Sequence, residues 1–110
     1  MTPKFVCVGN VLLLFCGLAL AAQPSGTQTF VGNISDSACG LHHTMGGSAK
    51  SCTLMCVNMG SKFVLADEAH HKVYALSDQA KAKPFAGEKV RVVGSIRGAS
   101  IEVTSITAVK

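Results

Sequence analysis

Alternating apolar and polar positions predict five short β-strands along most of this chain. In residues 89–96, Val90, Val92, Gly94 and Ile96 fall on one face, and charged or polar residues fall on the other. This period of two is typical of a strand with one buried face. The five runs that read as strands are residues 29–35, 62–66, 72–76, 89–96 and 101–108.

The segments between these strands carry turn signals. The polar stretch 67–71 separates two β-branched or aromatic runs and predicts a hairpin. In the last strand the apolar positions change phase between Val103 and Ile106, which predicts a β-bulge near Thr104 or Ser105.

Two short helices interrupt the strands. Residues 77–83 favour a helix with Ser77 as its N-cap, and Pro84 and Gly87 are expected to end it. A second helix is predicted over residues 51–59, after the first strand and before the stop at Gly60. Its inward stripe at i, i+3, i+4 and i+7 is expected to consist of sulfur-bearing residues only: Cys52, Met55, Cys56 and Met59.

Together these elements predict an all-β fold, a small five-stranded OB-like barrel. The Cys-bearing helix follows strand 1, and the other helix lies between strands 3 and 4. We assign residues 1–22 to a signal peptide, 23–28 to a flexible linker and 29–110 to the barrel domain.

The signal-peptide assignment rests on three features. Lys4 supplies the positive charge, residues 11–20 the apolar region, and Ala19-Leu20-Ala21 the small-x-small cleavage site. The apolar run is shorter than the roughly 20 residues of a membrane span. We therefore expect a secreted or periplasmic protein with no membrane attachment after cleavage.

Cleavage would change the composition that matters. About 88 residues would remain, with nine of the ten Lys/Arg against six Asp/Glu, a net charge of +3. A domain of this size buries only about 60–65% of its unfolded surface, so a covalent or metal cross-link would add useful stability. Three cysteines remain, and export exposes them to an oxidising compartment.

These three cysteines lie with two histidines inside residues 39–56. Thiolate and imidazole groups are soft metal ligands, and zinc accepts sets of three cysteines and one histidine. Cu(I) is also compatible, since thiolate and thioether ligands select it. The candidate ligands are Cys39, His42, Cys52 and Cys56, with His43 able to replace His42.

A disulfide is the alternative at the same residues. Cβ atoms at i and i+4 of a helix lie about 5–6 Å apart, whereas a disulfide needs about 3.8 Å. Cys52 and Cys56 are thus not expected to pair with each other. Either one can pair with Cys39, and the closed loop would contribute roughly 3 kcal/mol.

Other function classes find little support. Cys39 with His42 or His43 is the one candidate nucleophile and base, and Asp36 is its only candidate orienting group. The chain has no C-x-x-C pair, haem motif, G-x-S-x-G or phosphate-binding glycine loop, so we expect no enzyme. His70 and His71 fit an ordinary polar hairpin tip.

Nucleic acid is not expected as a partner. Single-stranded nucleic acid is bound by aromatic platforms along a basic groove. After the signal peptide the chain keeps four aromatic residues, mostly at core-like positions: Phe30, Phe63, Tyr74 and Phe85.

Several stretches resemble a family of small exported bacterial proteins known only as a domain of unknown function. These stretches are Gly32-Asn-Ile-Ser-Asp-Ser-Ala-Cys-Gly-Leu-His-His43, Cys52-Thr-Leu-Met-Cys-Val57, Lys72-Val-Tyr-Ala-Leu-Ser-Asp-Gln-Ala80 and Phe85-Ala-Gly-Glu-Lys-Val-Arg-Val-Val-Gly-Ser-Ile96. The resemblance covers nearly all of residues 29–108. It implies an OB-like barrel with a Cys/His insert, and it transfers no catalytic residue.

The sequence therefore predicts an exported, non-enzymatic binding module. Its expected partner is a metal ion, Zn or Cu, or another small ligand. A disulfide-stapled structural or interaction domain without metal is the alternative, and oligomeric state stays open.

Overall fold

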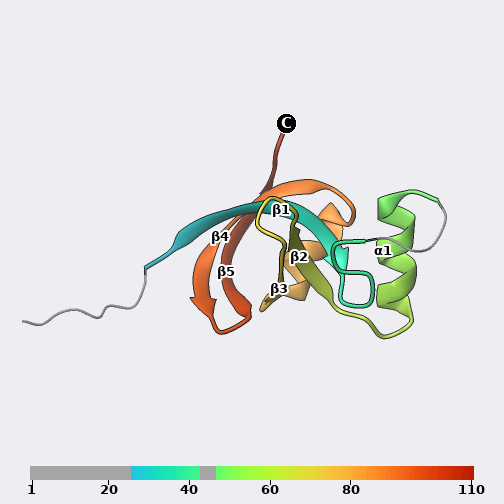
Figure 1. The fold of residues 1–110 in the computed structure, drawn as a ribbon, viewed down its shortest axis with the longest axis horizontal. Helices are drawn as coiled ribbons and strands as arrows, with labels where there is room; N and C mark the ends of the chain where they lie inside the picture. Colours follow the sequence, from blue (N-terminus) through green and yellow to red (C-terminus); the bar gives the residue numbers. More distant parts are fainter. Residues whose placement is uncertain (1–25, 43–46) are drawn as a thin grey trace, which may run out of the picture.

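The computed structural model describes residues 26–42 and 47–110, and within them five strands form a ring (Figure 1). The strands hydrogen-bond in the order β1–β2–β3–β5–β4, and β4 returns to β1. Among the strands of the described residues, β3 and β5 are the one pair that runs in parallel. In chain order the elements are β1 (Gln28–Asp36), α1 (Ala49–Asn58), β2 (Phe63–Asp67), β3 (Lys72–Leu76), α2 (Gln79–Ala82), the 3₁₀ helix η1 (Lys83–Phe85), β4 (Lys89–Arg97) and β5 (Ser100–Ala108).

The fold is mostly sheet with two short α-helices, which confirms the all-β class. Each predicted strand is present, and the bulge is also confirmed. Val93 pairs with Ser105 but Gly94 pairs with Val103, which leaves Thr104 as the extra residue of β5.

β1 closes the ring because it pairs with two strands in succession. Residues 28–33 pair with β4, and residues 33–36 pair with β2. Gly32 lies where β1 passes between them, and a β-carbon there would lie 2.5 Å from the carbonyl oxygen of Ala66. The close approach of β1 and β2 at this point therefore requires glycine.

We expect Gly32→Ala to lower the free energy of unfolding by about 1–3 kcal/mol, because the added carbon forces β1 and β2 apart. Urea denaturation measures this change. Gly26→Ala is the matched control, since nothing lies within 4 Å of a β-carbon at that position. Equal midpoints for the two variants would show that β1 tolerates a side chain at this crossing.

The core lies inside the ring. Every strand contributes to it, and Ala82 of α2 and Ala86 after η1 close one side. The inward face predicted for β4 is confirmed, because Val90, Val92 and Gly94 are buried while Lys89 and Arg91 are exposed. The buried residues of this core are Ile34, Phe63, Leu65, Leu76, Ala82, Ala86, Val90, Val92, Ile101 and Ile106.

The start of α2 differs from the prediction. Asp78 is the N-cap, and its side chain accepts a hydrogen bond from Lys81 N at 2.9 Å. Ser77 Oγ instead accepts from Val103 N at 2.9 Å, which holds β5 beside this segment. Pro84 does not stop the helical path, because it lies at the start of η1, where its missing N–H costs nothing.

The helix α1 lies beside the ring near the end of β1 (Figure 1). It begins at Ala49, with Ser48 as N-cap, two residues earlier than predicted. The predicted inward stripe of sulfur is wrong for its two methionines: Met55 and Met59 are 49% and 77% exposed. Since α1 packs against the ring through one narrow side, only Cys52, Thr53 and Cys56 are buried.

The predicted signal peptide 1–22, residues 23–25 of the predicted linker and His43 lie outside the described residues. Within residues 26–42 and 47–110, no helix has the length and apolar character needed to cross a bilayer.

Candidate metal centre

A tight turn at the end of β1 positions the first two groups of the site. Asp36 is fully buried, and its Oδ1 accepts hydrogen bonds from Ala38 N at 3.0 Å and Cys39 N at 2.9 Å. Gly40, at φ 59°, completes the turn by donating from its N–H to the Asp36 carbonyl at 2.8 Å. The turn therefore fixes the Cys39 backbone next to the Asp36 carboxylate.

The other two groups come from α1. Cys52 and Cys56 are one helical turn apart, so their side chains share one side of the helix. They are 2% and 9% exposed. The Ser48 hydroxyl accepts from Ser51 N at 3.1 Å and sets where the helix begins. This start places the two thiols toward the turn that follows β1.

The four groups meet at one point. One ligand atom from each of Asp36, Cys39, Cys52 and Cys56 lies within 4.8 Å of all the others. The sulfur atoms of Cys39 and Cys52 are 3.9 Å apart. Sulfurs bound to a single tetrahedral zinc at about 2.3 Å lie about 3.8 Å apart, so this spacing matches a shared metal.

The Asp36 carboxylate is only half satisfied. Its Oδ2 is buried and has no hydrogen-bond partner; Thr53 Oγ1 is the one other such side-chain atom in the described residues. Leaving a buried polar atom without a partner is unfavourable, and most buried polar atoms have one. A cation held among the sulfurs would give this oxygen a partner, because the oxygen could then bind it as a ligand.

The environment of Cys56 keeps its thiol protonated when no cation is present. Burial, together with the charge of Asp36 and the contact with Cys39, raises the pKa of Cys56 from 9.0 to about 12. A bound metal reverses this situation, because it deprotonates a coordinating thiol outright.

This raised pKa predicts the pH dependence of the metal-free protein. A thiol that binds its proton more tightly when folded stabilises the fold below its unfolded pKa and loses that contribution as pH rises. We expect the urea midpoint in EDTA to fall between pH 9 and about 12. The fall should be smaller in Cys56→Ala; an equal fall in both proteins would assign it to other groups.

No disulfide is at bonding distance among the described cysteines. The 3.9 Å between Cys39 Sγ and Cys52 Sγ is nearly twice the roughly 2.05 Å of an S–S bond. Both pairings predicted from the sequence bring side chains together without an S–S bond: the sulfur atoms of Cys39 and Cys52 lie 3.9 Å apart, and Cys39 also contacts Cys56.

The structure does not bring His42 to the sulfur cluster. Its side chain is exposed and borders a surface cavity with Leu41, Glu68 and His71. His42 N donates to the Cys39 carbonyl at 3.0 Å, so the chain turns back toward solvent after Cys39. His43 lies outside the described residues.

The fourth converging group is therefore a carboxylate, that of Asp36, which the sequence suggested only as an orienting group. Asp36 falls three residues before Cys39, at the end of a predicted strand. An aspartate at that position readily makes a turn by accepting from backbone N–H groups two and three residues later. This spacing was the available signal, since such a turn brings the carboxylate to the cysteine.

Comparisons with protein-family models, with curated proteins and with solved structures give no match.

Proposed function

We propose that this protein is an exported, non-enzymatic module that binds one zinc ion through Asp36, Cys39, Cys52 and Cys56. The observation that supports this most strongly is the convergence of three sulfurs and a buried carboxylate within 4.8 Å. The second is the Asp36 oxygen that lacks a hydrogen bond.

Zinc fits this set of groups better than copper does. Zinc takes thiolate and carboxylate ligands together, at about 2.3 Å and 2.0–2.2 Å. Cu(I) is selected by thiolates and thioethers, and a carboxylate is a poor ligand for so soft an ion. Met55 of α1 and Met59, its C-cap, offer no support for copper, because both are exposed.

The proposed role is structural or storage rather than catalytic. Four protein ligands complete a tetrahedral shell, whereas catalytic zinc sites keep one position open for water or substrate. The ion would tie α1 to the end of β1, two segments joined by the stretch 37–48. In a small exported domain such a link would take the place of a disulfide.

Export is proposed from the first residues of the chain, through Lys4, the apolar run 11–20 and Ala19-Leu20-Ala21. We also propose that the ring is an OB-like barrel. Five strands with a helix between the third and fourth agree with that architecture.

Zinc content and thiol state of the purified protein test the proposal together. We expect about one zinc per chain by mass spectrometry of the element, its loss on dialysis against a chelator, and recovery on adding zinc. The intact mass of the non-reduced chain should show no loss of two hydrogens. Negligible zinc uptake by a fully reduced, folded chain would overturn the proposal.

A Cys39–Cys52 disulfide is the second candidate, favoured by the contact of these two sulfurs at 3.9 Å. It would give a structural domain without metal. The non-reduced mass would then be lower by two hydrogens, and the chain would take up no zinc unless it was first reduced.

A further inference from the structure

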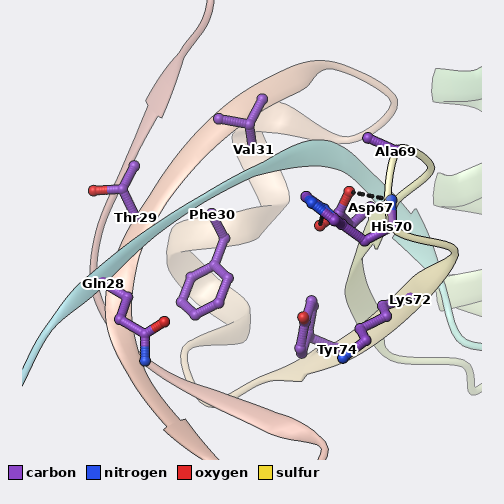
Figure 2. Close-up of a pocket in the computed structure, with 9 residues that line it drawn as sticks. All are labelled: Gln28, Thr29, Phe30, Val31, Asp67, Ala69, His70, Lys72 and Tyr74. Atoms are coloured by element: carbon purple, nitrogen blue, oxygen red, sulfur yellow. Dashed lines mark hydrogen bonds and ion pairs between the residues drawn. The ribbon is translucent and has the colours of Figure 1, made fainter. Parts of the chain in front are cut away.

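A second cavity opens at the other end of β1, away from the cysteines. It has a volume of about 430 Å³ and lies between the first residues of β1, β3 and the β2–β3 hairpin. Ligand-binding pockets usually measure about 300–1,000 Å³. Figure 2 shows Phe30 and Tyr74 in the middle of this cavity, with Gln28 on one side and the Asp67–His70 pair on the other.

The cavity is a continuation of the ring interior. Alternate residues of a strand share a face. On β3, Leu76 is in the core, Tyr74 is half-buried, and Lys72 is exposed at the mouth. On β1, Ile34 is in the core, Phe30 is half-buried, and Gln28 is exposed at the mouth. Both inner faces thus change from apolar to polar as they reach the opening.

The floor of the cavity is aromatic. The rings of Phe30 and Tyr74 lie with centroids 5.3 Å apart and planes inclined at 54°. Two inclined rings offer a third planar ring one face to stack on and one edge to meet, the two arrangements that aromatic groups prefer. The floor therefore suits a flat aromatic group.

The rim carries a lysine whose charge is available to a ligand. The Asp67 carboxylate is paired with His70. Its Oδ1 accepts from His70 N at 3.2 Å, and its Oδ2 contacts His70 Nδ1 at 2.8 Å. Lys72 takes part in none of the ion pairs among described residues, which are His70–Asp67, Lys81–Asp78 and Arg97–Glu102. The rim thus has an ammonium group available to an anion.

We propose that this cavity binds a small aromatic carboxylate, with its ring on Phe30 and Tyr74 and its carboxylate directed to Lys72. The exposed His70 ring lies at the same rim, where Nε2 is left to the ligand because Nδ1 faces Asp67. This site shares no residue with the cysteine cluster, and the proposal does not depend on zinc.

The chain contains a built-in reporter for this site. Tyr74 is the only tyrosine, and there is no tryptophan, so intrinsic fluorescence arises next to the cavity. Benzoate is the probe, benzyl alcohol has the ring without the charge, and acetate has the charge without the ring. Methyl glucoside tests whether a neutral sugar occupies the site instead.

We expect a saturable fluorescence change with benzoate, binding of benzyl alcohol weaker by roughly tenfold, and no change with acetate. Lys72→Met should weaken benzoate binding by roughly tenfold, since it removes the ammonium group and keeps the aliphatic stem. Lys83→Met is the matched control, because Lys83 is an exposed lysine of η1 outside the cavity.

Amide NMR shifts give a second measurement that does not rely on Tyr74. Benzoate should move the signals of residues 28–31 and 67–74, and Tyr74→Leu should reduce the effect while the spectrum stays folded. Absence of saturable binding, equal affinity in Lys72→Met and Lys83→Met, or preference for the glucoside would each overturn the proposal.

Discussion

Replacement of Cys52 with alanine is expected to weaken zinc binding by about a hundredfold to a thousandfold. Structural zinc sites with four ligands bind with about 10–16 kcal/mol, so one ligand accounts for about 2.5–4 kcal/mol. Each 1.4 kcal/mol is about a factor of ten in affinity. Competition with a chromophoric chelator measures the change, and circular dichroism of the metal-free variant checks that it folds.

Met59→Leu provides the control for this variant. Met59 is also a sulfur-bearing residue at the C-terminal end of α1, but it is 77% exposed and lies outside the converging group. We expect its zinc affinity to equal that of the unaltered protein. Unchanged zinc affinity in Cys52→Ala would exclude Cys52 as a ligand. A large loss of affinity in Met59→Leu would show that the effect is not specific to the buried thiols.

Substitution of Asp36 by asparagine is expected to separate metal binding from folding. The asparagine oxygen can still accept from Ala38 N and Cys39 N, so the turn is kept. The variant loses the buried charge at the oxygen that has no hydrogen bond. Burying an ionised group without full compensation is costly, so the metal-free variant should be as stable as the unaltered protein or more stable by about 1 kcal/mol.

The zinc affinity of Asp36→Asn should fall, although its metal-free stability does not. An amide is neutral and a weaker ligand than a carboxylate, and we expect the affinity to fall by at least roughly tenfold. Urea denaturation with EDTA and with saturating zinc measures both effects in one series. Lower metal-free stability with unchanged zinc affinity would identify Asp36 as part of the turn only.

The strands could be predicted from sequence because their evidence is local. Alternation in residues 89–96 depends only on which side chains face the core, and the phase change after Val103 fixed the bulge at Thr104. The helix caps were less predictable. Ser77 and Asp78 are both good N-caps, and the choice between them depends on Val103 of β5, which takes the Ser77 hydroxyl.

The site was predicted in part for the same reason. The spacing of Cys52 and Cys56 already placed both thiols on one side of a helix, and Cys39 was the nearest third sulfur. Which helical side faces inward depends on tertiary packing, so the exposure of Met55 and Met59 was not predictable from the stripe. Asp36 lies with the three sulfurs and His42 does not, because the turn after β1 holds the Asp36 carboxylate next to the Cys39 backbone.

X-ray absorption spectroscopy at the zinc edge tests the proposed site most directly, because it counts the atoms bound to the metal. We expect three sulfurs at about 2.3 Å and one oxygen at about 2.0–2.2 Å. Asp36→Asn should alter only the oxygen shell, and Cys52→Ala should leave two sulfurs. A first shell with fewer than three sulfurs in the unaltered protein would contradict binding by Cys39, Cys52 and Cys56 together.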